Sequence, residues 1–85
     1  MQIISVNYEL KKPGGNYEKL YETLKSYNCM HPMTSCWLLK TNESTDIVYN
    51  KLKSFIDGND CLLVDTLSVN RAGCLSQEAI DWLSS

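Results

Sequence analysis

The spacing of apolar residues changes from a strand period to a helix period within the first third of the chain. From residue 3 to residue 10 apolar and polar side chains alternate, which is the pattern of a strand with one buried face. After a break at residues 11–15, apolar residues recur every three or four positions and predict an amphipathic helix over residues 17–27, capped by Asn16. The apolar strand face is Ile4, Val6, Tyr8 and Leu10, and the helix face is Tyr17, Leu20, Tyr21, Leu24 and Tyr27.

Strand and helix patterns continue to alternate along the rest of the chain. In order, the sequence predicts a short extended segment at 29–34, a strand at 35–41, a helix that follows cap residues 42–46 and ends at Gly58, a strand at 61–69 and a short helix at 76–83. Trp82 is expected to pack that last helix down. With the first strand and helix, this order makes two βαβ-like halves. We therefore predict an α+β, ferredoxin-like (split βαβ) fold, in which a four-stranded antiparallel sheet carries two packed helices and a short C-terminal helix.

The length of the chain leaves room for one hydrophobic core, so residues 1–85 are predicted to form a single ferredoxin-like domain. A chain of this size buries only about 60% of the surface that its unfolded form exposes, which favours a homodimer. No apolar run approaches the ~18 residues of a membrane span, and the first residues carry no leader pattern. We expect a cytoplasmic protein that does not bind a membrane.

The balance of charge limits the partners that we expect. With a formal net charge of -2, the chain lacks the basic surplus with which proteins grip long nucleic acids. Lys11 and Lys12 form one local basic cluster. A nucleotide or a short nucleic acid therefore fits this composition better than a long duplex does.

The four cysteines, at positions 29, 36, 61 and 74, are expected to be reduced thiols. A disulfide framework needs a secreted context, which the sequence does not indicate. With His31 the cysteines give the spacing C-x-H-x4-C, which matches no ordinary zinc pattern and lacks a fourth ligand. His31 is otherwise a ligand contact or an ordinary surface histidine. We predict no resident metal and no other cofactor.

The segment before the first helix has the chemistry of an anion site. Gly14 and Gly15 allow a close approach to the backbone, and a helix capped by Asn16 would direct its unbonded N–H groups at this segment. Lys11 and Lys12 would add mobile positive charge. The plain alternative is a solvated turn between a strand and a helix. The full set of predicted ligand-binding residues is Tyr8, Lys11, Lys12, Gly14, Gly15, Asn16, His31 and Arg71.

Three stretches of the sequence match a known pattern. They are VNYELKKPG at residues 6–14, HP at 31–32 followed by SCWLLKT at 35–41, and LSQEAIDWL at 75–83. The chain resembles, over nearly its whole length, a family of short stand-alone bacterial and phage proteins, some of them labelled "SinR family". That family is similar in fold to the second CRISPR-associated adaptation protein, a dimeric ferredoxin-like domain.

The similarity to the CRISPR protein implies a homodimer with a metal-dependent phosphodiesterase site. In that protein a tyrosine-aspartate pair ends the first strand, and two aspartates meet across the dimer to hold a divalent metal. The matching pair here is Tyr8-Glu9. Glutamate is an oxygen ligand suited to Mg²⁺, but its extra methylene moves the carboxylate by more than about one ångström, a shift that lowers catalytic rates steeply. Glu9 is the catalytic candidate if the protein is a Mg²⁺-dependent nuclease; otherwise it is a solvated acid.

Three functions are compatible with these features. The leading hypothesis is a small homodimeric, non-catalytic binding module for a nucleotide or short nucleic acid, for example a phage or mobile-element factor that sequesters a defence nucleotide signal. The first alternative is a metal-dependent endonuclease or phosphodiesterase related to the CRISPR adaptation protein. The second is a protein-interaction module that inhibits a host protein. An enzyme is the less favoured class, because Glu9 departs from the metal-binding pattern.

Overall fold

Strand β1 (Gln2–Glu9) lies inside the sheet, between β3 (Cys36–Thr41) and β4 (Cys61–Thr66). The computed structural model describes residues 1–11, 17–68 and 70–85. The remaining elements, in chain order, are helix α1 (Glu18–Lys25), strand β2 (Asn28–Met33), helix α2 (Thr45–Lys53) and helix α3 (Gln77–Ser84). Their order along the chain agrees with the order that the sequence predicts.

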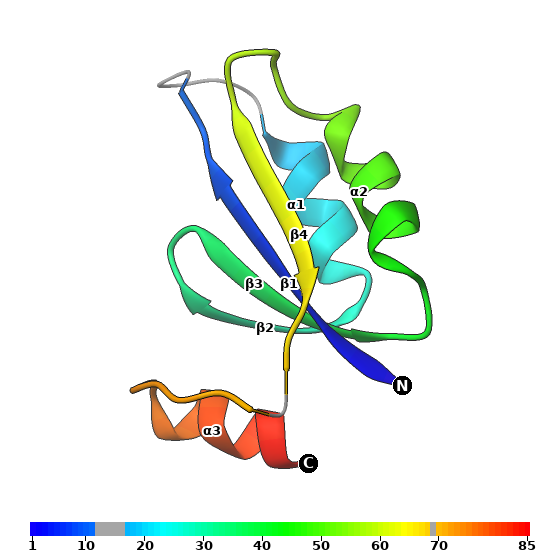
Figure 1. The fold of residues 1–85 in the computed structure, drawn as a ribbon. Helices are drawn as coiled ribbons and strands as arrows, with labels where there is room; N and C mark the ends of the chain where they lie inside the picture. Colours follow the sequence, from blue (N-terminus) through cyan, green and yellow to red (C-terminus); the bar gives the residue numbers. More distant parts are fainter. Residues whose placement is uncertain (12–16, 69) are drawn as a thin grey trace.

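The four strands form one antiparallel sheet in the order β2-β3-β1-β4. Because β1 and β2 both run antiparallel to β3, they are parallel to each other with β3 between them. In the same way β1 separates the parallel strands β3 and β4. Each βαβ unit is thus split by a strand of the other unit, and the predicted ferredoxin-like fold is confirmed. Figure 1 shows this arrangement.

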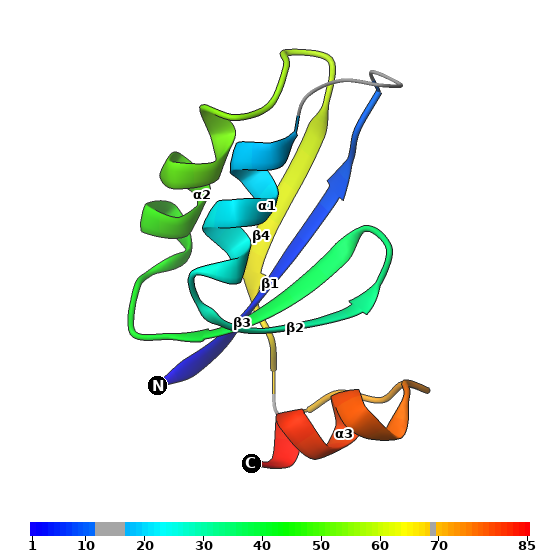
Figure 2. The same ribbon diagram turned by 180° about the vertical axis from the view of Figure 1, so that it is seen from behind.

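The core lies between one face of the sheet and the helices α1 and α2, as Figure 2 shows from behind. The alternating pattern of β1 places Ile4 and Val6 on this face, and both side chains are fully buried. Leu24 of α1 and Leu52 of α2 meet them from the helix layer. The complete cluster is Ile4, Val6, Leu20, Leu24, Trp37, Leu39, Val48 and Leu52.

The boundaries of three elements differ from the sequence prediction. Helix α1 begins at Glu18 with Tyr17 in the N-cap position, and no side chain caps it. Asn16, the predicted N-cap, lies outside the described residues. Helix α2 ends at Lys53 rather than near Gly58, although Phe55 beyond it still packs on the core. Strand β4 ends at Thr66, three residues earlier than expected.

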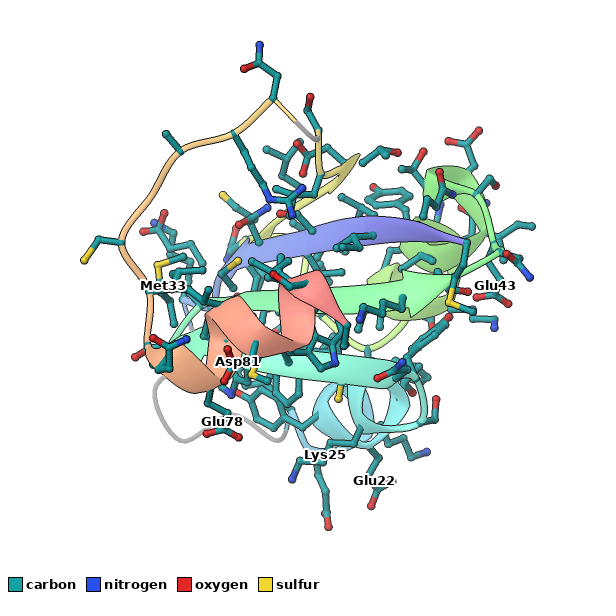
Figure 3. All side chains as sticks on the ribbon, turned by 90° about the horizontal axis from the view of Figure 1, so that it is seen from below. Glu22, Lys25, Met33, Glu43, Glu78 and Asp81 are labelled. Carbon is teal, nitrogen blue, oxygen red and sulfur yellow. The ribbon has the colours of Figure 1, made fainter. Side chains whose placement is uncertain are left out.

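Helix α3 and the segment before it lie on the sheet face opposite α1 and α2. Ser76 caps α3 as predicted, because its side chain accepts a hydrogen bond from the Ala79 N–H. Ala79 is fully buried against the sheet. Figure 3, the view from below, shows α3 in front of the strands, with Glu78 and Asp81 on it. The sheet face that α1 and α2 leave uncovered is thus partly covered by another part of the same chain.

The contact between α3 and the sheet depends on Lys40 and Trp82. Lys40 Nζ donates to the carbonyls of Trp82 and Ser85 at the C-terminal end of the helix. Its ammonium group also lies 4.4 Å from the centre of the Trp82 ring, and Trp82 Nε1 donates to Asn28 Oδ1 of β2. Trp82 therefore packs α3 onto the sheet, as predicted.

No helix in the described ranges is long and apolar enough to cross a membrane.

Leu39→Ala tests the position of the core. Leu39 is fully buried at the centre of the sheet, so its truncation should lower the free energy of unfolding by about 2–5 kcal/mol. Ile47→Ala, on the exposed side of α2, is the control and should change the free energy of unfolding by less than about 0.5 kcal/mol. Urea denaturation followed by circular dichroism measures both. Equal effects of the two substitutions would contradict this assignment of the core.

Candidate functional site

The structure separates the predicted site residues into different places. Tyr8 and His31 lie together at the turn between β2 and β3. Lys11 pairs with Glu9 at the end of β1. Arg71 lies in residues 70–76, the segment before α3 that we call the connector. It lines a groove on the sheet face opposite α1 and α2. The remaining four predicted residues, Lys12, Gly14, Gly15 and Asn16, lie outside the described residues.

Tyr8 and His31 belong to a hydrogen-bonded aromatic cluster. The Tyr8 hydroxyl donates to the Thr34 carbonyl at 3.1 Å and accepts from Trp37 Nε1 at 2.9 Å. His31 Nε2 donates to the same carbonyl, and the His31 ring stacks on Trp37 with 4.0 Å between the ring centres. Burial is the main reason that the pKa of Tyr8 is raised. The structural role of this cluster is to fix the β2–β3 turn against β1. His31 is exposed, so its side chain remains accessible to a ligand.

Glu9 and Lys11 form an exposed ion pair. Lys11 Nζ lies 2.6 Å from Glu9 Oε1, and the hydrogen bond to Glu9 raises the pKa of Lys11. Such a pair is screened by water and salt, so it contributes little to stability. For the nuclease hypothesis, a metal ion would have to compete with the Lys11 ammonium for this carboxylate. In the part of the chain that the structure describes, no three His, Cys, Asp or Glu side chains lie close enough to hold a metal ion together.

Asp60 is a residue that sequence reasoning missed. Its Oδ1 accepts hydrogen bonds from the Lys11 backbone N–H at 2.7 Å and from the Tyr17 hydroxyl at 3.2 Å. Its Oδ2 accepts from the Asp57 N–H at 2.8 Å. The hydrogen bond from the Lys11 N–H is the main cause of the lowered pKa of this carboxyl. Asp60 thereby ties together the end of β1, the start of α1 and the turn before β4.

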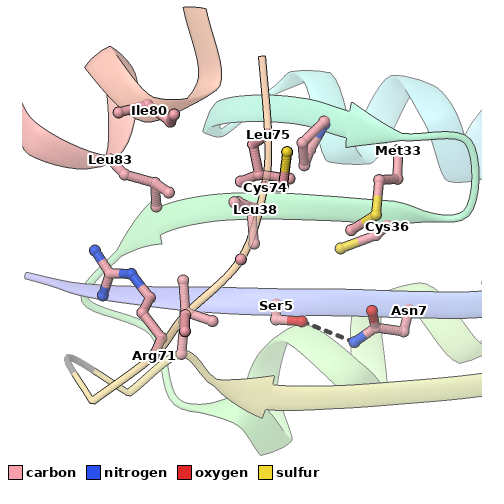
Figure 4. A pocket seen from close by; sticks show the side chains of 14 residues that line it. Ser5, Asn7, Met33, Cys36, Leu38, Arg71, Cys74, Leu75, Ile80 and Leu83 are labelled. Carbon is pink, nitrogen blue, oxygen red and sulfur yellow. Dashed lines mark hydrogen bonds between the residues drawn. The ribbon is translucent and has the colours of Figure 1, made fainter. Parts of the chain in front are cut away.

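A groove with a volume of about 490 Å³ lies on the sheet face opposite α1 and α2. Ser5 and Asn7 of β1 and Leu38 of β3 form its floor, and Figure 4 shows the connector crossing in front of these strands. The lining residues are Ser5, Asn7, Pro32, Met33, Cys36, Leu38, Leu67, Arg71, Ala72, Gly73, Cys74, Leu75, Ile80 and Leu83. We call this hollow the connector groove.

The connector groove is largely apolar, with a few polar groups at fixed positions. On its floor, Asn7 Nδ2 donates to Ser5 Oγ at 2.7 Å, which holds both side chains in place. Arg71 Nη1 donates to the Ser68 carbonyl at 3.0 Å, and the rest of its guanidinium is exposed. Burial raises the pKa of the Cys36 thiol, so this cysteine is a poor nucleophile. Apolar walls with few polar groups are typical of a small-molecule site.

The lining of the connector groove limits the chemistry that it can support. Of the described residues around it, none is a histidine, an aspartate or a glutamate. General acid–base catalysis commonly uses one of these side chains, and a hard metal ion needs carboxylate or carbonyl oxygens. The groups that this described lining offers a bound molecule are apolar side chains, a hydroxyl, an amide, thiols and a guanidinium.

No protein-family model matches this chain, and no curated protein matches its sequence. The assignment of a function therefore depends on the chemistry of the sites themselves.

Asp60→Ala should lower the thermal midpoint of unfolding, and Asp60→Asn should lower it less, because asparagine keeps an acceptor oxygen. Since the folded-state pKa of Asp60 is lowered, its contribution to stability is present above the ordinary aspartate pKa. It should disappear as the pH falls through the lowered folded-state value. Melting curves from pH 3 to pH 7 test this, and a difference between wild type and Asp60→Ala that grows at low pH would refute it.

All four cysteines should titrate as free thiols under denaturing conditions without reductant, because none is paired with another in the described structure. In the native protein, Cys61 and Cys74 are exposed and should react quickly with a thiol reagent. Cys36 should react slowly, because it is buried and its pKa is raised. Mass spectrometry of the alkylated peptides gives the order in which the cysteines react. Rapid labelling of Cys36 would show that the connector does not cover β3.

Proposed function

We propose that this protein is a homodimeric, non-catalytic binding module for a nucleotide or a short nucleic acid. The observation that carries the proposal is the connector groove, in which a guanidinium group stands beside an apolar hollow that lacks acid–base residues. The resemblance to short stand-alone bacterial and phage proteins adds to it. In a phage or mobile element, such a module would lower the concentration of a defence nucleotide signal by holding it rather than by cleaving it.

The size and chemistry of the connector groove support a ligand of this class. Its volume of about 490 Å³ lies within the roughly 300–1,000 Å³ of typical ligand sites. Leu38, Leu75 and Leu83 provide apolar surface for a planar base. Arg71 provides a planar guanidinium that can bind a phosphate with two parallel hydrogen bonds. The buried Ser5 and the half-buried Asn7 can hydrogen-bond the edge of a base or a ribose hydroxyl.

We place the ligand in the connector groove rather than at the segment after β1. Lys11 Nζ is paired with Glu9, and the Tyr8 hydroxyl is committed to Thr34 and Trp37. Neither residue is among those that line the connector groove. Among the predicted ligand-binding residues that the structure describes, Arg71 is the one that lines the connector groove.

The two alternative functions use other parts of the surface. A Mg²⁺-dependent nuclease would need Glu9 to exchange Lys11 for a metal ion and to meet the Glu9 of a second copy. Its activity should then be lost in Glu9→Gln, whereas the proposal expects no Mg²⁺- or Mn²⁺-dependent cleavage of DNA or RNA by the wild type. A host-protein inhibitor would leave the connector groove without a ligand and would copurify with a protein instead.

Arg71→Ala should weaken binding of a phosphate-bearing ligand by at least about tenfold, which is the scale of a hydrogen bond to a charged group. The ligand is identified first, by mass spectrometry of the small molecules released when the purified protein is heated. Isothermal titration of that nucleotide then compares wild type, Arg71→Ala and the control Lys11→Ala. The control should bind as the wild type does.

Three results would contradict the proposal. Heated protein that releases no nucleotide, and native protein that binds none from a panel of mono-, di-, tri- and cyclic nucleotides, would refute the ligand class. Loss of binding in Lys11→Ala but not in Arg71→Ala would return the site to the segment after β1. Robust metal-dependent cleavage that Glu9→Gln abolishes would favour the enzyme.

A further inference from the structure

The two edges of the sheet differ in how they are protected. Edge strand β2 contains Pro32, has an irregular register between Met30 and Met33, and contacts α3. Proline, bulges and covering helices are the usual means by which proteins block an edge strand. Edge strand β4, with the sequence CLLVDT, has no proline, glycine or lysine, and its pairing with β1 is regular over its whole length. The β4 edge therefore remains suitable for pairing with a further strand.

The register of β4 against β1 shows which backbone groups reach that edge. The Leu67 N–H donates to the Ile3 carbonyl at 2.8 Å, and these two residues are opposite each other in the register that pairs Ile4 with Thr66. In an antiparallel ladder, successive residues direct their N–H and C=O groups alternately to the two sides. Residues 61, 63 and 65 thus bond to β1, and Leu62, Val64 and Thr66 direct their backbone groups outward. Within the described ranges, these outward groups have no hydrogen-bond partner.

The side chains of β4 also leave apolar surface beside this edge. Leu63, on the same sheet face as Asn7, is 63% exposed, the most of any large apolar side chain within the described strands. On the helix side, Leu62 and Val64 are only partly buried against the core. Helix α2 packs against β4 and leaves Tyr49 40% exposed. An edge with unpaired backbone groups and apolar side chains on both faces is an aggregation hazard unless a specific partner covers it.

We propose that a second copy of this chain covers the β4 edge, so that β4 pairs with β4 of the partner in antiparallel orientation. The two four-stranded sheets then form one continuous sheet, with the helix layers on the same side. This inference supplies an interface for the homodimer of the proposed function and makes no use of the ligand. The occupant is a second copy rather than an unrelated strand because β4 is complementary to itself in one register.

That register is centred on Leu63, which then lies directly opposite Leu63 of the second copy. Leu62 lies opposite Val64 of the other copy, and the outward backbone groups of each such pair can exchange both of their hydrogen bonds. Asp65 lies opposite Cys61 rather than opposite a second aspartate, so no two like charges meet. In the neighbouring register, centred on Val64, the exposed Leu63 would lie opposite Asp65. Apolar pairing and charge therefore both select the register centred on Leu63.

The β4 interface also leaves the connector groove open. The groove is covered by the connector and α3, which reach the sheet on the side of β2 and β3. Pairing through β4 extends the sheet at its other edge, so two grooves lie on one face of the dimer. Binding of a ligand and dimerisation can then be measured independently.

Leu63→Lys is the first test. The substitution places two lysines opposite each other at the symmetry axis of the dimer. Because Leu63 is largely exposed in the single chain, folding of each copy should be unaffected. Light scattering should give a mass of about twice 9.7 kDa for the wild type at micromolar concentration. For Leu63→Lys, the dissociation constant of the dimer should rise at least about tenfold. The matched control is Met33→Lys, a 54% exposed residue on the blocked edge strand β2, which should remain a dimer. Circular dichroism checks that both variants are folded.

Cross-linking tests the register. In a Cys61→Ser background, the cysteine of Leu63→Cys would lie directly opposite the same cysteine of the second copy. This is a non-hydrogen-bonded pair, in which the Cα atoms are ~4.5 Å apart and a disulfide can form. Mild oxidation should therefore yield a covalent dimer on non-reducing gels. Val64→Cys in the same background should not cross-link, because it is opposite Leu62 of the other copy.

The outcomes separate this inference from the proposed function. A dimer that survives Leu63→Lys, or cross-linking of Val64→Cys in place of Leu63→Cys, would overturn the β4 interface and its register. A monomeric wild type would also overturn it, and if that monomer still bound a nucleotide, the binding proposal would stand without the dimer. A β4 dimer without nucleotide binding would uphold the interface and refute the ligand.

Discussion

The pairing of β1 with its two neighbours is the interaction on which the rest of the structure depends. Because side chains alternate along a strand, β1 serves both faces of the sheet at once. Ile4 and Val6 support the core beneath α1 and α2. Ser5 and Asn7, on the other face, form the floor of the connector groove. One central strand therefore links the stability of the domain to the site that we propose for its ligand.

The second determinant of the structure is the return of residues 70–85 across the sheet. Without this segment, the face that carries Ser5 and Leu38 would be open to water; with it, both residues are buried. The return is fixed by Lys40, which binds carbonyls at the end of α3, and by Trp82, which bonds to β2. A flat sheet surface thus becomes a groove, and Arg71 is carried to its margin.

The candidate site could be predicted only in part. The alternation in β1 placed Tyr8 on the helix side, and the turn after β2 brought His31 beside it, but both side chains are bonded to Thr34 and serve the fold. Arg71 was named without a location, because no local pattern indicates which sheet face a connector crosses. Asp60 was missed, because its hydrogen bonds join residues far apart in the chain, and a single aspartate in a turn has no distinctive pattern.

The sequence by itself determined the class of fold. Period-two and period-3.6 spacing record which side of each element is buried, and the order of those elements leaves few ways to layer them. The tertiary structure alone decided where α3 lies, which sheet edge stays open and where a hollow forms. These depend on contacts such as Lys40 with Trp82, between residues far apart in sequence. Periodicity shows which face of a helix or strand is buried, but it does not show which other element buries it. The energy of a long-range contact depends on the relative positions of residues far apart in the chain, and only the folded structure sets those positions.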